Sequence, residues 1–442
     1  MVKLAELTAE NSARLYNRAL KSLPGGNTRT TVFFQPHPIY AASGAGCRVT
    51  DVEGVVRIDA INNFTSLIHG YAHPEINAAA IKQLSLGLCF GLPTEAEISL
   101  AEVLCNRVRS VEQIRFMNSG TEAVMTAIKA ARAYTGRPMI AKCEGSYHGT
   151  YDFAEISEGA SPDHWGDKRR PQSVASSVGT PSGVLADVLV LPFNDVEASE
   201  ALLREHADRL ACILIDPMPN RVGLIKASPE YLTMLRRVAD ACGSLLIFDE
   251  IICFRLGLHG AQGAMEVQPD LTTFGKIIGG GFPVGALGGK ADIMTVFDPR
   301  RGKPAVPHGG TFTANPITMV AGHAAMQLLT PDAFAHLQML GQRLQHGLER
   351  EFAARGIDGQ VTGDCSLRRI HFGSARLHDY RSSYSDAAKA RRMGALHRAM
   401  LAHGVLMAPT GLMALSTVMT IDDVDEIVLA FRKSLPDVLE GA

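Results

Sequence analysis

Residues 114–134 read IRFMNSGTEAVMTAIKAARAY, and this stretch indicates the fold class of the chain. Ile114 to Met117 form a candidate strand, and residues 121–134 carry apolar side chains at the spacing of an amphipathic helix. The alternation continues, so we expect further strands at 139–142, 210–216 and 245–248 and further helices at 75–86, 95–108 and 229–242. Short apolar strands separated by amphipathic helices predict an α/β fold, with a mostly parallel central sheet and helices on both faces.

The two ends of the chain are organised differently from its centre. A helix is expected up to about residue 22, and the alternating residues 47–58 suggest two strands joined by a turn at Asp51-Val52-Glu53-Gly54. The segment from 323 onward suggests helix, strands and helix. We therefore predict a large domain at 71–322 and a smaller α+β domain built from residues 1–70 and 323–442.

The composition is that of an ordinary globular protein. The 442 residues are 46% hydrophobic and 20% charged, with a formal net charge of −2. These values argue against a disordered chain, a disulfide scaffold and a basic nucleic-acid-binding surface. No apolar run reaches the roughly 18 residues of a membrane-spanning helix, and the N-terminus lacks a secretory pattern. Eight cysteines without a C-x-x-C pair indicate reduced thiols, so we expect a cytoplasmic protein without membrane or nucleic-acid partners.

The turn after the first strand is a candidate phosphate site. Ligands of parallel sheets bind beyond the carboxyl ends of the strands. Ser119 and Glu122 fit the capping box S-x-x-E, and Gly120 allows a ligand close to the backbone. Free N–H groups and the hydroxyls of Ser119 and Thr121 at a helix start suit an anion, although a plain helix cap is the simpler alternative.

Two charged residues follow other predicted strands. Asp249 ends the most apolar strand, where its carboxylate could hold a protonated ring nitrogen of a cofactor or merely cap the next turn, and Ile251 would pack on the same side. Lys276 lies among small and apolar residues at 273–283. A lysine in a dry pocket has a lowered pKa and a nucleophilic amine, as Schiff-base chemistry requires, whereas a surface lysine in a glycine-rich loop is the alternative.

Two further loops carry weaker signals, and several known motifs are missing. Tyr147 and His148 could stack on a planar ring, and the hydroxyl-rich stretch 308–316 could reach a phosphate or form a turn. There is no P-loop, no G-x-G-x-x-G spacing and no G-x-S-x-G elbow. His69 and His73 lack the glutamate of H-E-x-x-H, so we expect no metal site.

Taken together and in this order, these stretches resemble the class III pyridoxal 5′-phosphate (PLP) aminotransferases of fold type I. The nearest branches are glutamate-1-semialdehyde aminomutase and the β-amino-acid (β-phenylalanine-type) transaminases. The resemblance covers nearly the whole chain, and its most specific parts are residues 118–123, 147–149, 249–251 and 275–281. It implies that 71–322 is the PLP-binding domain and that the enzyme is a homodimer with shared active sites.

The resemblance also implies roles for single residues. Lys276 would form the Schiff base with PLP and shuttle a proton, and Asp249 would pair with the pyridine nitrogen. The phosphate would be bound by Ser119, Gly120, Thr121 and, from the neighbouring subunit, Thr311. Tyr147 and Ile251 would cover the two faces of the ring, with His148 nearby. The 27 residues from Asp249 to Lys276 allow one βα crossover, which would place both at the same sheet edge.

The substrate is indicated by departures from the aminomutase branch. That branch has a glutamate a few residues after Ala-Pro, whereas residues 408–415 here contain no carboxylate. Asn27-Thr28-Arg29 resembles the β-amino-acid transaminase segment whose arginine binds the substrate carboxylate. Thr410 stands where those enzymes often have a second arginine. Arg255 could substitute for it, although a structural ion pair is the more natural role.

We therefore expect ping-pong transfer of an amino group from a β-amino acid or related donor to a 2-oxo acid or aldehyde. One alternative is intramolecular transfer, as in glutamate-1-semialdehyde aminomutase. Another is a nucleotide-binding module without PLP, in which Lys276 has no chemical role. The sequence leaves the donor, its stereochemistry and the acceptor open.

Overall fold

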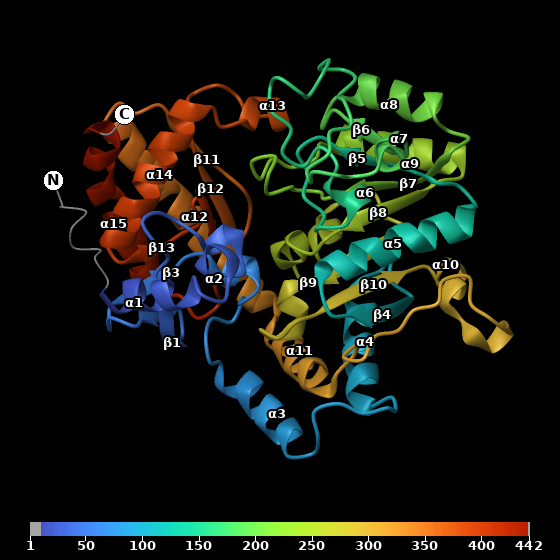
Figure 1. Cartoon of the computed structure of the whole chain (residues 1–442), viewed down its shortest axis with the longest axis horizontal. Helices are drawn as coiled ribbons and strands as arrows, with labels where there is room; N and C mark the ends of the chain where they lie inside the picture. Colours follow the sequence, from blue (N-terminus) through green and yellow to red (C-terminus); the bar gives the residue numbers. More distant parts are fainter. Residues whose placement is uncertain (1–9, 441–442) are drawn as a thin grey trace.

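The computed structural model describes residues 10–440, and its centre is a seven-stranded sheet (Figure 1). In spatial order the strands are β4 (Gln113–Met117), β10 (Gly285–Gly289), β9 (Leu271–Gly275), β8 (Leu245–Asp249), β7 (Leu210–Ile215), β5 (Met139–Cys143) and β6 (Val188–Leu191). The five strands from β9 to β6 are parallel, and β10 pairs antiparallel with both β9 and β4. This confirms the predicted α/β fold with a mostly parallel sheet.

Helices cover both faces of this sheet because its strands are apolar on both sides. On one face, Ile140, Leu214 and Ile247 pack with α5 (Gly120–Thr135). On the other, Ile213 and Phe248 pack with α9 (Pro229–Cys242), beside which lies α8 (Val196–Glu205). Each strand and helix named in the sequence analysis of this region lies within two residues of its predicted bounds.

Two features of the sheet differ from expectation. Strand β10, with the sequence GALGG, was not predicted, because glycine is depleted in strands. It is glycine-rich because the start of α5 packs directly on it, and a Cβ at Gly285 would collide with the Ser119 carbonyl. The crossover from β8 to β9 contains no α-helix but two 3-10 helices, Cys253–Leu256 and Ala261–Ala264.

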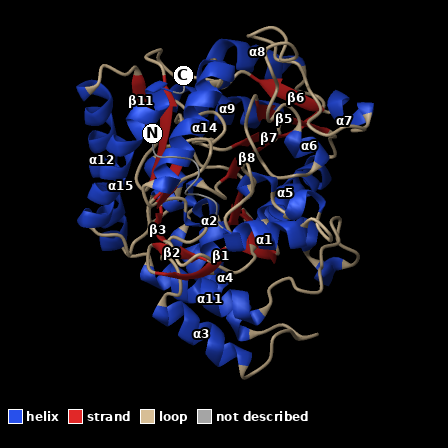
Figure 2. Cartoon of the chain, turned by 60° about the vertical axis from the view of Figure 1, so that its left-hand side comes forward, coloured by secondary structure: helices blue, strands red, loops and turns tan. Residues whose placement is uncertain are grey.

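The two ends of the chain meet in one smaller sheet. Its order is β1 (Ala41–Ala45), β2 (Arg48–Asp51), β3 (Val56–Asp59) and β13 (Val405–Leu406), with Ile58 opposite Val405. A further sheet contains β11 (Gly359–Thr362), β12 (Leu367–Phe372) and β14 (Leu412–Ala414). Long helices pack beside them, away from α5 (Figure 2): α12 (Pro331–Ala354), α14 (Ala387–Ala402) and α15 (Ile421–Glu440). The domain division at residues 70 and 322 stays a prediction.

The remaining helices connect these layers. They are α1 (Glu10–Ala19), the single turn α2 (Asn62–Thr65), α3 (Pro74–Leu84), α4 (Glu95–Arg107), α6 (Asp152–Glu155), α7 (Ser182–Ala186), α10 (Ala291–Met294), α11 (Pro316–Leu328) and α13 (Tyr380–Ser383). Within residues 10–440, no helix combines the length and apolar character needed to span a membrane.

Candidate active site

A cavity of about 340 Å³ opens where β5, β7, β8 and β9 end and α5 begins. Eight of the predicted site residues line it: Ser119, Gly120, Thr121, Tyr147, His148, Asp249, Ile251 and Lys276. They come from four separate stretches of the chain, which the parallel strands bring to one edge of the sheet. The structure therefore places the main predicted candidates in a single pocket.

Asp249 and His148 form a buried pair on the wall of this pocket. Asp249 Oδ2 lies 2.7 Å from His148 Nδ1, and its Oδ1 accepts hydrogen bonds from Thr273 Oγ1 and the Ile251 N–H, both at 3.1 Å. Burial lowers the pKa of His148 despite the nearby carboxylate. The Nε2 atom of His148 is buried without a hydrogen-bond partner in the described part of the protein. The Asp249 carboxylate is thus held in one orientation from three sides.

Lys276 follows β9 directly and lines the same pocket as this pair. Its φ of +51° is in the left-handed region, which a non-glycine residue adopts only when its surroundings require it. Burial lowers the pKa of the Lys276 amine, against the opposing influence of Asp249 and Asp216. A larger share of neutral, nucleophilic amine follows.

The start of α5 forms an anion site of backbone and hydroxyl groups. Ser119 is the N-cap, and its hydroxyl accepts the Glu122 N–H at 3.2 Å. The Glu122 carboxylate accepts the Asn118 N–H at 2.7 Å, one residue before the position that a complete capping box requires. Gly149, with φ +90°, packs so closely on Thr121 that a Cβ would lie 2.6 Å from its Oγ1. The free N–H groups at this helix start therefore border the pocket beside the loop that carries Tyr147 and His148.

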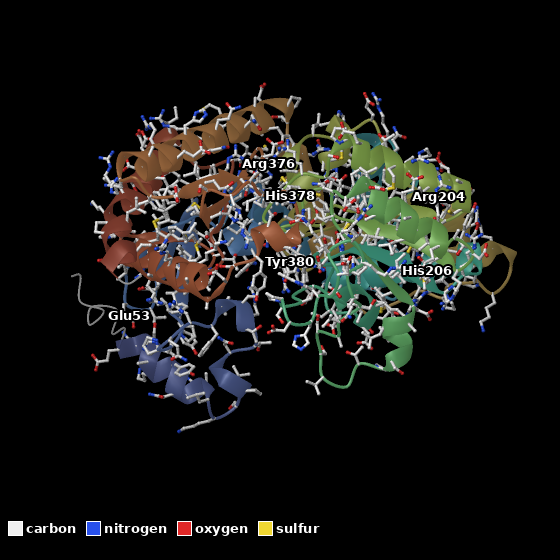
Figure 3. All side chains as sticks on the ribbon, turned by 90° about the horizontal axis from the view of Figure 1, so that it is seen from above. Glu53, Arg204, His206, Arg376, His378 and Tyr380 are labelled. Atoms are coloured by element: carbon white, nitrogen blue, oxygen red, sulfur yellow. The ribbon has the colours of Figure 1, made fainter. Side chains whose placement is uncertain are left out.

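The Tyr147 loop is supported by Arg221, which follows β7, and by Tyr380 from the C-terminal part of the chain. The Arg221 guanidinium lies 4.7 Å from the Tyr147 ring centre, and it also pairs with Glu158 at 2.9 Å. The Tyr380 ring packs on Gly145, and its hydroxyl donates to the Ala160 carbonyl at 2.9 Å. Figure 3 shows Tyr380 where the C-terminal part of the chain meets the part that contains the seven-stranded sheet.

Asp216 is a pocket residue that the sequence analysis missed. It follows β7 and lines the cavity with Asp249 and Lys276, and its Oδ1 accepts the Met218 N–H at 2.9 Å. Burial, together with the neighbouring Asp249, raises the pKa of Asp216 to about 8. A carboxylate directly after an apolar strand is the same signal that identified Asp249. The sequence therefore contained the information needed to find it.

Two predicted site residues lie outside the pocket lining. Arg29 is exposed, and it reaches the site through Asn63, whose Oδ1 accepts its Nη1–H at 2.8 Å. Thr311 is exposed in the loop before α11 and does not line the pocket of its own chain. The structure therefore brings Arg29 beside the pocket, whereas Thr311 is not among the residues that line it.

Both roles considered for Arg255 are wrong. Its guanidinium is completely buried and donates to the Ser366 hydroxyl at 2.9 Å, to the Thr65 carbonyl at 3.0 Å and to the Leu415 carbonyl. These partners are uncharged, so Arg255 forms no ion pair within residues 10–440, and its burial keeps it away from an acceptor carboxylate. Burial lowers the pKa of Arg255 to about 10.

The sheet and pocket together define a fold type I PLP enzyme. Residues 33–435 match the family model described as aminotransferase class-III. This chain belongs to the class-III aminotransferase family. Glutamate-1-semialdehyde 2,1-aminomutase of Methanothermobacter thermautotrophicus is 37% identical over 402 residues, covering 90% of this chain and 92% of the relative.

Solved structures also resemble the chain along its whole length. An omega-transaminase from Sphaerobacter thermophilus is 50% identical, with a TM-score of 0.96 and coverage of 99% of this chain and 100% of that one. A transaminase with PLP bound is 45% identical, with a TM-score of 0.91 and coverage of 98% and 99%. A β-phenylalanine aminotransferase from Variovorax paradoxus is 34% identical, with a TM-score of 0.85 and coverage of 96% and 93%.

The pocket has the features that PLP requires, and PLP is the cofactor of this enzyme. Its volume is within the usual range for cofactor sites. It combines an amine, a fixed carboxylate and a helix N-terminus suited to a phosphate. The unpartnered His148 Nε2 is one buried polar atom that a polar ligand in the pocket could satisfy.

Proposed function

We propose that this aminotransferase takes its amino group from a β-amino acid and passes it to a 2-oxo acid or an aldehyde by a ping-pong mechanism. The observation that carries this assignment is the position of Arg29. Its guanidinium is held by Asn63 at the wall of the lysine pocket, and a guanidinium matches a carboxylate with two parallel hydrogen bonds. The similarity to a β-phenylalanine aminotransferase supports the same class of donor.

PLP, when bound, supplies an aldehyde that reacts with amines and an electron sink for a carbanion. We assign covalent attachment and proton transfer at the donor carbon to Lys276 Nζ, because its lowered pKa makes the neutral amine an effective base. Asp249 would hold the ring nitrogen in its protonated form. His148 and Thr273 keep the Asp249 carboxylate oriented for that task.

The remaining contacts hold the coenzyme in place. The phosphate would lie at the start of α5, with Ser119, Gly120 and Thr121 as donors. Tyr147 and Ile251, which both line the pocket, would cover the two ring faces. A fixed ring excludes water and limits the donor carbon to positions within reach of Lys276.

We also propose a homodimer in which Thr311 completes the phosphate site of the partner. An apolar stretch from α3 to α4 is exposed, as a subunit interface requires; its members are Ile81, Leu84, Leu86, Leu88, Phe90, Leu92 and Ile98. Leu92 is the most exposed of these seven residues, at 78%. Thr311 and Phe312 are exposed too, so they are free to contact a second copy.

The cysteines support a reducing compartment. All eight are free thiols, and the buried ones include Cys143, Cys212 and Cys253. Because buried thiols persist where glutathione keeps cysteines reduced, we propose a cytoplasmic location.

An aminomutase activity is the second candidate. It is favoured by relatives named glutamate-1-semialdehyde 2,1-aminomutase, of which that of Methanothermobacter thermautotrophicus is 37% identical. It is opposed by residues 408–415, which contain no carboxylate where the aminomutase pattern has a glutamate.

Isotope transfer separates the two activities. ¹⁵N-labelled β-phenylalanine and a panel of unlabelled 2-oxo acids and aldehydes would be incubated with the enzyme, with glutamate 1-semialdehyde tested in parallel. We expect ¹⁵N in the product of at least one acceptor, and Lys276→Ala should abolish it. Conversion of the semialdehyde without transfer to any acceptor would instead establish the aminomutase.

A further inference from the structure

The turn between β3 and His69 has an unusual backbone. Four successive residues, Asn62 to Thr65, have φ values of +51°, +47°, +53° and +76°. Residues with a side chain rarely adopt the left-handed region, and a run of four is strained. Strain of this kind persists only where the surrounding structure holds it, and it is concentrated at functional sites.

Three buried side chains hold this turn in place. Asp59 Oδ1 accepts the N–H groups of Ile61 and Asn62 at 2.8 and 2.9 Å. The Asn62 amide donates to the Ala414 carbonyl, and Arg255 Nη1 donates to the Thr65 carbonyl at 3.0 Å. The buried Arg255 guanidinium thus affects the site indirectly, because it holds the backbone of the turn in place.

The turn displays Asn63 between the lysine pocket and Arg29. Asn63 and Ser66 line the pocket, and Asn63 Nδ2 donates to Ser66 Oγ at 3.1 Å. Asn63 Oδ1 accepts from Arg29 Nη1 at 2.8 Å. The guanidinium also lies over the Phe64 ring, 5.0 Å from its centre. Two successive residues of the strained turn therefore contact the same arginine.

We propose that Asn63 is a positioning residue for substrate selection, which holds Arg29 at the mouth of the pocket so that donors carrying a carboxylate are preferred. This proposal rests on the proposed function. A neutral amide is suited to the task because it occupies one of the five N–H donors of arginine and leaves its charge available. An aspartate at position 63 would instead pair with the guanidinium and compete with the substrate.

Binding of unreactive ligands tests the proposal without turnover. The probes are 3-phenylpropanoate and its uncharged amide, measured by their effect on the absorption of the holoenzyme. We expect the wild type to bind the carboxylate about tenfold more tightly than the amide. Asn63→Asp and Arg29→Met should both remove that preference and leave the Kd of the amide within about twofold. The matched control is Asn11→Asp, an exposed asparagine that bonds the Val52 carbonyl, and it should keep the preference.

The outcomes separate this inference from the proposed function. A wild type without a carboxylate preference, including one that binds neither probe, overturns the inference, as does an Asn63→Asp variant that weakens both probes equally. Half-reactions with β-phenylalanine and 1-phenylethylamine provide the second readout, and Asn63→Asp should raise KM for the former only. The wild type could show the carboxylate preference, and Asn63→Asp could lose it, while β-phenylalanine donates no amino group. In that case the proposed donor is wrong and the proposal for Asn63 stands.

Discussion

Replacement of Gly149 by alanine measures how closely the Tyr147 loop approaches the start of α5. Gly149 has φ +90°, and its Cβ would lie 2.6 Å from Thr121 Oγ1 and 2.8 Å from Thr121 Cα. Gly179 has almost the same φ, +91°, but apart from its own atoms and its two chain neighbours no atom of residues 10–440 lies within 4 Å of its Cβ position. Gly179→Ala therefore carries only the cost of the backbone conformation, about 1–2 kcal/mol. Gly149→Ala adds the collision, which typically costs about 1–3 kcal/mol.

Urea denaturation of the two coenzyme-free variants compares these free energies of unfolding directly. We expect Gly149→Ala to be less stable than Gly179→Ala by about 1–3 kcal/mol. The displaced loop should also weaken PLP binding about tenfold, which is about 1.4 kcal/mol, while Gly179→Ala keeps the wild-type Kd. Equal stability losses with unchanged PLP affinity would refute the close approach, and with it the arrangement of loop and helix around the phosphate.

Two further expectations concern buried charges. The pKa of Asp216 is raised to about 8, so its carboxyl is mostly protonated at pH 7 and resembles an uncharged amide. Asp216→Asn should therefore keep kcat within a few-fold, whereas Asp249→Asn should lower kcat at least about tenfold. Equal effects of the two substitutions on kcat would contradict this expectation. Lys142 Nζ donates to the Ser146 and Ile156 carbonyls, and burial lowers the pKa of this amine from 10.5 to about 7. Between these values the unfolded chain binds more protons, so Lys142 makes the free energy of unfolding rise with pH. The difference between wild type and Lys142→Met should therefore rise by about 1 kcal/mol per pH unit from pH 7.5 to 9.5 in urea titrations, and a constant difference would exclude the shift.

Local pattern was sufficient for most of the central sheet. The apolar runs and helical spacings around 114–134 and 229–248 depend on neighbours a few residues away, and the structure has the same elements. Strand β10 is not predicted because the local pattern does not show why it needs glycine. A Cβ at Gly285 would meet Ser119 at the start of α5, and a Cβ at Gly288 would meet Val111, both of which lie far from it in the sequence. The low strand propensity of glycine describes β10 as an isolated segment, whereas the elements that pack against β10 decided its conformation.

The residues of the pocket also divide into those that local sequence pattern predicts and those that depend on distant parts of the chain. Asp249, Lys276 and the turn before α5 could be found because parallel strands deliver the residues after their carboxyl ends to one place. The same rule applies to Asp216, which was overlooked. For Arg255 no local rule exists, since its partners Thr65 and Leu415 lie at least 160 positions away.

The sequence by itself determined most strands and helices of the seven-stranded sheet, β10 excepted, and which charged groups stand at the strand ends, because both follow from periodicity and chain order. Only the tertiary structure decided the left-handed turn at Asn62–Thr65 and the contact between Asn63 and Arg29. Those depend on buried hydrogen bonds between distant segments, including one from Asn62 to Ala414. Such bonds form only once the sheets have packed, since the isolated turn would relax to a less strained backbone.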